Sequence, residues 1–300
     1  MDRFEELRAL VAVVDAGGFS AAAERLQVAK SAISRRIADL EGRLGVRLIH
    51  RTTRRINLSG EGRALYERAT RLLEDLGEAE QAVSSPAAAL QGRVRVAAPL
   101  TFGLHHLSPV INAFIVQHQG LVLDLDLNDR KVDLVNDGFD MAVRIGRLED
   151  SSLVARRINT IRMVCVASPA YLDAHGHPTH PSELSAHWGL RYTNLPRGYG
   201  WRFTGTDGTT VQADAPDRLT ASNGDVLTQA TVDGLGISVA PRFIVHRHLE
   251  QGILVPILED FALEEVGLYL VYPPGRYQSR RVRLLADWLA ERLGGDQPWS

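Results

Sequence analysis

Apolar residues recur at helical spacing near the start of the chain. Within 30–44 they follow one another at intervals of four, three and four, which places them on one face of a helix. A shorter helix of small and apolar residues is predicted at 19–26, about three residues upstream. This arrangement is typical of a helix-turn-helix, whose second helix enters the major groove of DNA. The apolar residues of the second helix are Ile33, Ile37, Leu40 and Leu44.

The polar side of the second helix carries residues suited to DNA recognition. Arginine can donate two hydrogen bonds to guanine, and serine can bond to any base edge. Ser20 is expected to cap the first helix with its hydroxyl. Two amphipathic helices that only form part of a core are the alternative interpretation. The residues expected to contact DNA are Ser20, Lys30, Ser31, Ser34, Arg35 and Arg36.

Charge favours the DNA-binding interpretation. Residues 1–58 contain eleven Arg and Lys against seven Asp and Glu, a net charge of +4, whereas the whole chain carries −2. A basic end on an acidic chain is typical of a module that binds phosphates. Short apolar segments at 48–50 and 56–58 predict a two-stranded wing that reaches phosphates or the minor groove. Its expected DNA contacts are Arg51, Thr52, Arg54 and Arg55.

A long helix without proline is predicted over 59–84. Its apolar residues repeat at alternating steps of four and three, the a/d pattern of a coiled-coil seam. Pairing of two such helices would place two recognition helices on half-sites about one helical turn apart. A helix packed only on its own domain is the alternative. The predicted dimerisation residues are Leu65, Ala69, Leu72, Leu76, Ala79 and Val83.

Strands and helices alternate along the rest of the chain. Every second residue of 121–127 is leucine, which predicts a strand buried on one face. The order of elements predicts a mainly parallel sheet with helices on its faces, so the expected fold class is α/β. The expected domains are a winged helix-turn-helix (1–58), a linker helix (59–85), a hinge (86–91) and a two-lobed domain (92–300). Lobe I would comprise about 92–164 and 267–300, and lobe II about 165–266.

Several ordered motifs resemble one known family. They are FEELRALVAVVDAGGFS at 4–20, SRRIADLEGRLGVRL at 34–48, RTTRR at 51–55 and LSGEG at 58–62. Together they resemble the N-terminus of LysR-type transcriptional regulators. Two residues depart from the family pattern: Ala29 stands where a Ser or Thr cap is usual, and Lys30 where Gln or Pro is usual. Shorter motifs resemble the effector-binding domain of that family: GRVRV at 92–96, DMAVRIG at 140–146 and GLGISVAP at 234–241.

The resemblance implies a DNA-binding transcriptional regulator with a type 2 periplasmic-binding-protein-like effector domain. A small-molecule effector would bind between the two lobes and control the regulator. The implied partners are double-stranded promoter or operator DNA, a second copy in a homodimer, a tetramer, and RNA polymerase when the protein activates. A solute-binding protein without a transcriptional role is the alternative, and the basic first domain opposes it.

Polar residues at the ends of strands, including Asp129, are candidates for the effector pocket. The helix after Pro99 is expected to begin at the cleft, where its free amides and its dipole favour an anion. Arg130 or Arg147 could bind a carboxylate, so an anionic effector is the hypothesis. Thr101 and Asn223 could instead only cap helices. The candidate effector-binding residues are Leu100, Thr101, Phe102, Asn128, Arg130, Gly146, Arg147, Ser222 and Asn223.

Other classes of function find little support in the sequence. The single cysteine, Cys165, allows no intrachain disulfide. The histidines between 175 and 187 lack the spacing of a zinc enzyme, and no nucleophile motif is present. We therefore expect no catalytic residues, metal or cofactor. No stretch approaches the roughly 18 apolar residues of a membrane span, and the N-terminus does not resemble a signal peptide. The expected location is the cytoplasm, in association with the nucleoid, with no membrane partner.

Overall fold

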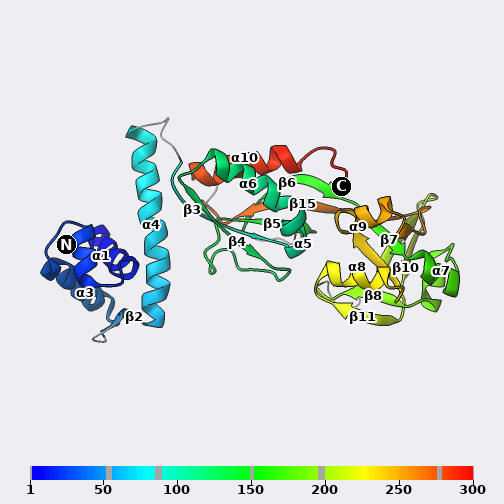
Figure 1. The fold of residues 1–300 in the computed structure, drawn as a ribbon, viewed down its shortest axis with the longest axis horizontal. Coiled ribbons are helices and arrows are strands. Elements are labelled where there is room, and N and C mark those ends of the chain that lie inside the picture. Colours follow the sequence, from blue (N-terminus) through cyan, green and yellow to red (C-terminus); the bar gives the residue numbers. More distant parts are fainter. Residues whose placement is uncertain are drawn as a thin grey trace. The chain divides into compact units, whose positions relative to one another are not determined.

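The computed structural model describes residues 2–51, 56–84, 90–148, 152–194, 200–275 and 279–299, without the side chains of 51, 78 and 81–84. The chain forms two compact units, Met1–Arg93 and Val94–Ser300 (Figure 1). Each unit is described by itself below.

The first unit is a winged helix-turn-helix followed by one long helix. Its elements are α1 (Arg3–Asp15), α2 (Phe19–Arg25), α3 (Lys30–Leu44), β1 (Ile49–Arg51), β2 (Ile56–Leu58) and α4 (Gly60–Ser84). The predicted helix pair is observed as α2 and α3, and β1 pairs with β2 in antiparallel register. No helix in the described part of the chain is long and apolar enough to cross a membrane.

The apolar face of α3 forms the centre of this unit. Ile33, Ile37 and Leu40 are fully buried, together with residues of α1 and α2. Leu44, predicted on the same face, is 42% exposed, so that part of the expectation is wrong. Leu44 is the last residue of α3, and Gly45 then ends the helix in the left-handed conformation at φ 70°.

The start of α4 is held against the wing by residues of the LSGEG motif. The Ser59 amide donates to the Leu48 carbonyl oxygen at 3.0 Å, and the Ser59 hydroxyl accepts a hydrogen bond from the Gly62 amide at 2.9 Å. A Cβ atom at Gly62 would lie 2.0 Å from the Leu48 oxygen, so only glycine allows this approach. The motif therefore has a structural role at the junction of the wing and α4.

Neither α2 nor α3 has a side-chain hydrogen bond at its N-cap. The N-cap of α2 is Gly18 and makes no side-chain hydrogen bond, whereas Ser20 lies inside the helix and is exposed. The prediction that Ser20 caps α2 is therefore wrong. Ala29 is the N-cap of α3 and offers no side-chain acceptor, as its residue type requires.

The second unit contains two mixed sheets and a small antiparallel sheet. Its strands are β3 (Gly92–Ala98), β4 (Leu121–Leu127), β5 (Met141–Gly146), β6 (Val154–Ile161), β7 (Met163–Ala167), β8 (Gly189–Tyr192), β9 (Trp201–Gly205), β10 (Thr210–Ala213), β11 (Asp217–Ala221), β12 (Ile237–Pro241), β13 (Val255–Pro256), β14 (Phe261–Leu263) and β15 (Val266–Tyr272). Its helices are α5 (Leu100–Phe102), η1 (Gly103–Leu107), α6 (Ser108–Gln117), α7 (Pro169–His175), η2 (Pro181–Ala186), α8 (Gly224–Val232), α9 (Arg242–Glu250) and α10 (Arg280–Leu293).

Each large sheet forms one lobe. The first lobe contains the sheet β4-β3-β5-β15-β6 with α5, η1, α6 and α10, and the second contains β11-β8-β12-β7-β13 with α7, α8 and α9 (Figure 1). The small sheet β10-β9-β14 also belongs to the second lobe. The expected parallel arrangement is observed for β3 with β5 and for β8 with β11 and β12. One strand of each large sheet runs in the opposite direction: β15 is antiparallel to β5 and β6, and β7 is antiparallel to β12 and β13. β7 is the first strand of the second lobe, and β15 is the strand that returns the chain to the first lobe.

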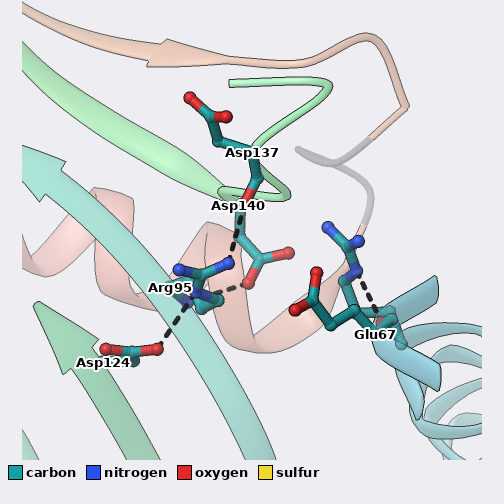
Figure 2. Close-up of polar contacts among 6 residues, drawn as sticks. Glu67, Arg95, Asp124, Asp137 and Asp140 are labelled. Atoms are coloured by element: carbon teal, nitrogen blue, oxygen red, sulfur yellow. Dashed lines mark hydrogen bonds and ion pairs between the residues drawn. The ribbon is translucent and has the colours of Figure 1, made fainter. Parts of the chain in front are cut away.

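Arg95 ties three segments of the first lobe together (Figure 2). Its amide and Nε donate to the carboxylates of Asp140 and Asp124 at 2.9 and 3.0 Å, and Nη1 donates to the Asp137 carbonyl oxygen at 2.7 Å. The guanidinium also lies 4.8 Å from the centre of the Phe139 ring. These bonds hold the edge strand β4, of which only Leu121 is fully buried, and the segment that precedes β5.

Candidate functional site

The first candidate site is the polar side of α3. Lys30, Ser31 and Arg35 are exposed and Ser34 is half-buried, opposite the buried apolar face of the helix. The Arg35 side chain is 76% exposed, and its Nε lies 3.9 Å from Asp39. At that distance Arg35 is only weakly held by its neighbour. The helix therefore presents hydroxyls and cationic groups on the side opposite its buried face.

Arg36 differs from the other residues predicted to contact DNA. Its side chain is only 25% exposed, and Nη2 pairs with the Glu5 carboxylate of α1 at 2.8 Å. Two turns further along α3, Arg43 pairs with Glu6, whose side chain is 4% exposed. These two ion pairs fasten α3 to α1, so Arg36 has a structural partner that sequence reasoning missed.

The wing is described only in part. Arg51 ends β1 opposite Ile56, and its side chain lies outside the described residues. Thr52, Arg54 and Arg55 also lie outside them. Arg47, which was not among the predicted contacts, precedes the wing and is exposed. Its signal in the sequence is a basic residue between the recognition helix and the first wing strand.

The predicted dimerisation residues of α4 divide into two groups. Leu65 packs against the core of the first unit and Ala69 is fully buried there, because α4 lies against α1. The Tyr66 hydroxyl donates to Asp15 at 2.6 Å, and this hydrogen bond raises the pKa of Tyr66. Leu72, in contrast, is 54% exposed. Leu76 is half-buried, Ala79 is exposed, and the side chain of Val83 is not described. The first two seam residues thus pack within their own domain.

The second candidate site is the junction of the two lobes. The Thr101 hydroxyl in the first lobe donates to Asp225 Oδ2 in the second at 2.6 Å. Asp129 of the first lobe accepts from the Leu100 amide and from Asn223 Nδ2, both at 3.0 Å. We use the term lobe junction for the residues that make these contacts: Leu100, Thr101, Asp129, Asn194, Ser222, Asn223 and Asp225.

Asn194 adds two further hydrogen bonds at the lobe junction. Its Nδ2 donates to the Asp129 carbonyl oxygen at 2.9 Å and to the Ser222 carbonyl oxygen at 3.2 Å. The Ser222 side chain was the predicted contact, but its backbone makes the bond. Tyr192, close to Asn194, has its pKa raised by burial. The lobes are therefore joined directly by polar groups.

Two residues that could have been simple caps behave differently. Asn223 caps α8, since its Oδ1 accepts from the amides of Asp225 and Val226 at 3.0 and 3.3 Å, while its Nδ2 bonds across the lobes. Thr101 caps no helix. It is 4% exposed, and its hydroxyl is used for the bond to Asp225. Asn223 therefore caps a helix, as the alternative interpretation expected, and also bonds across the lobes. For Thr101 the capping interpretation is wrong.

The remaining candidates lie around the lobe junction with other partners. Asn128 forms a local turn with Asp126 and the Arg130 amide, and the Arg130 residue is exposed. Gly146 ends β5 with φ at 138°. Arg147 forms an ion pair with Glu264. Arg147, one of the two arginines proposed to bind a carboxylate of the effector, is therefore already paired.

Phe102 lies in an aromatic cluster and not on an open surface. It is fully buried, and its ring meets those of Phe243 and Trp299 edge-on at 5.3 and 5.5 Å. His106 Nε2 lies 3.2 Å from the Phe243 carbonyl oxygen, and burial lowers the pKa of His106 to about 4. The neutral ring lies 4.9 Å from that of Trp299. The cluster packs α5 and η1 against α9.

Sequence reasoning missed one acidic residue of the lobe junction. Asp225 was not among the candidate contacts, although it lies in the first turn of a helix and accepts a hydrogen bond from the predicted Thr101. Asp129, which follows Asn128 at a strand end, was expected to line the pocket, and it bonds the predicted residues Leu100 and Asn223. Burial raises the pKa of the Cys165 thiol. Within the described residues, no group of His, Cys, Asp and Glu side chains is arranged to hold a metal ion.

Comparison with known proteins gives two family matches that together span most of the chain. Residues 4–63 match the bacterial regulatory helix-turn-helix protein, lysR family, and residues 87–294 match the LysR substrate binding domain. The regulator PtxR of Pseudomonas aeruginosa is 37% identical over 96% of this chain and 92% of its own length.

Solved structures of similar proteins agree with these matches. The structure of CrgA, a LysR-type transcriptional regulator from Neisseria meningitidis, is 33% identical, covers 98% of this chain and 100% of its own, and has a TM-score of 0.62. The full-length structure of the Vibrio cholerae virulence activator AphB is 30% identical, with coverages of 97% and 99% and a TM-score of 0.59.

Proposed function

Because this chain belongs to the LysR family of DNA-binding transcriptional regulators, we propose that α3 and the wing read its operator and that a small molecule bound at the lobe junction controls this binding. The observation that carries the first part is the exposed polar side of α3 above a fully buried apolar face. A helix held in this way can lie in the major groove with Ser31, Ser34 and Arg35 toward the bases.

The proposed effector site rests on direct contacts between the lobes. Thr101 and Asn223, both among the predicted effector residues, bond across the lobes to Asp225 and Asp129. A ligand that replaces or adds to these bonds would change the relative stability of alternative lobe arrangements. Effector binding would thereby alter how the DNA-binding pairs of an oligomer are placed.

The proposed assembly is a homodimer formed through α4. We propose that two such dimers associate as a tetramer. The exposed Leu72 supports a partner for α4 beyond its own domain. We propose the cytoplasm, with the nucleoid, as the place of action, and contact with RNA polymerase where the protein activates. We propose no catalytic role, in keeping with relatives that are transcriptional regulators.

Genomic footprinting of the tagged protein in its own cell tests the DNA-binding proposal. We expect a small number of promoters that share an inverted repeat, because a two-fold dimer recognises two related half-sites. Absence of enrichment at any site would show that the N-terminal unit does not read DNA in the cell. The genes beside the bound promoters would also indicate the chemistry of the effector.

Replacing Arg35 by alanine should weaken binding to such an operator by about 1–3 kcal/mol and relax the preference at one base pair. The reason is the loss of a guanidinium that is 76% exposed on the recognition helix. Binding is measured by fluorescence anisotropy with the operator and with each single-base variant of it. Arg8→Ala is the matched control, because it removes the same charge from α1, where the Arg8 side chain is 50% exposed. An Arg35→Ala protein with unchanged base preference would refute the assignment.

A further inference from the structure

The lobe junction holds two carboxylates that no cationic side chain of the described residues neutralises. Asp129 accepts hydrogen bonds from a backbone amide and a side-chain amide, and Asp225 accepts one from the Thr101 hydroxyl. In the described part of the chain, no Lys, Arg or His lies within ion-pair distance of either carboxylate. Both residues are half-buried, so water screens their charges incompletely. The described residues of the junction therefore carry two negative charges and no positive one near them.

The groups that could have bound an anion already have partners. The Leu100 amide, at the start of α5, is bonded to the Asp129 carboxylate. The free amides of α8 are capped by Asn223, and Arg147 is paired with Glu264. Arg130 is exposed and pairs with neither carboxylate of the junction. An anionic ligand would meet two negative charges and few free donors.

A buried hydroxyl next to Asp225 lacks a partner. Thr228 is 4% exposed, and its Oγ1 makes no hydrogen bond to any residue that the structure describes. It lies three residues after Asp225 on α8, and residues three apart are neighbours on the surface of a helix. Unpaired buried polar atoms are uncommon in folded proteins, so this hydroxyl is available to a group that the chain does not supply. Its oxygen can accept a hydrogen bond, as the two carboxylates can.

We propose that the effector of this regulator carries a protonated amine or guanidinium that binds Asp129 and Asp225 at the lobe junction. This proposal rests on the proposed function, in which the junction is the effector site. An ammonium group offers three donors and no acceptor, which complements two carboxylates and a hydroxyl oxygen. A carboxylate has about four acceptor positions, so each aspartate can bind the cation in addition to its present partners.

Thermal unfolding of the full-length protein with two matched sets of small molecules tests the ligand class. The amines are 1,4-diaminobutane, agmatine, spermidine and cadaverine, and the carboxylates are succinate, glutarate, adipate and citrate. We expect at least one amine to raise the Tm by several degrees at saturation and no carboxylate to do so, because a ligand bound only to the native state stabilises it. The absence of stabilisation by every amine of this set overturns the inference.

Variants locate the binding on the proposed residues. Asp225→Asn removes the charge and keeps an oxygen for Thr101, so we expect the Kd for the stabilising amine to rise about 10-fold to 100-fold. Asp129→Asn should act in the same direction. Asp233→Asn is the matched control, because Asp233 is an exposed carboxylate at the C-terminal end of α8 that bonds Gln229. Equal loss of affinity in all three variants would mean unspecific attraction to an acidic surface and would overturn the inference.

Failure of this inference can be told from failure of the proposed function. A carboxylate that stabilises the wild type and no longer stabilises Thr101→Val would leave the effector site in place and reverse the ligand class. Promoter enrichment in the footprinting experiment is independent of either set of compounds. Only its absence would contradict the proposed role in transcription.

Discussion

Replacing Leu72 by lysine is expected to give monomers that bind operator DNA about 100-fold more weakly than the wild type. Leu72 is 54% exposed on α4, on the seam predicted from the heptad pattern. A lysine there would place a charge in an apolar helix pair. A monomer engages only one half-site, and loss of the second removes the gain in avidity of about 10²–10⁴ from linked binding modules.

Analytical ultracentrifugation and an electrophoretic mobility shift with the operator measure both parts of this prediction. Glu67→Lys serves as the control, because Glu67 is an exposed residue of α4 outside the seam and receives the same side chain. That variant should stay dimeric. A Leu72→Lys protein that also stays dimeric would show that α4 pairs through other residues.

Replacing Arg43 by methionine should destabilise the first unit by about 3–5 kcal/mol, because it leaves a buried carboxylate without its partner. Glu6 is 3% exposed, and Arg43 Nε donates to its Oε2 at 3.1 Å. The same carboxylate is reached by Nη2 of Arg43. Loss of this pair would also release α3 from α1, so DNA binding should fall with stability.

This loss is measured by urea denaturation, with unfolding of the first unit monitored by hydrogen exchange in peptides from residues 1–45. All four tryptophans lie at 188–299, so their fluorescence follows the second unit and should be unchanged. Arg36→Met is the matched control and should cost less than about 1 kcal/mol, because the side chain of its partner Glu5 is 34% exposed. A double replacement, Glu6→Leu with Arg43→Leu, should recover most of the stability. Equal loss in the Arg43→Met and Arg36→Met variants would contradict the role of burial.

The helix-turn-helix could be predicted from local pattern alone. The spacing of Ile33, Ile37 and Leu40 determines which face of α3 is buried, because a helix repeats every 3.6 residues whatever it packs against. The ordered motifs of the first 65 residues likewise sufficed to identify the family, which the family matches then confirmed. Arg35 is exposed as its position on the polar side predicts.

The partners of charged residues could not be predicted in this way. Arg35 and Arg36 are adjacent and chemically identical, yet one is exposed and the other is paired with Glu5 of another helix. Leu65 and Leu72 both lie on the predicted heptad seam, but only Leu65 packs on its own domain. Sequence spacing describes one helix, whereas these outcomes depend on where α1 lies beside it.

The character of the lobe junction was likewise decided by tertiary structure. By itself the sequence determined a regulator with a DNA-binding end and an α/β domain with polar residues at its strand ends. It suggested an anionic effector, because helix ends and arginines are recognisable locally. The fold brings Thr101 to Asp225 across 124 residues of chain and Asp129 to Asn223 across 94. Those contacts occupy the expected anion donors with the chain's own carboxylates, and no local pattern encodes which distant side chains a fold places together.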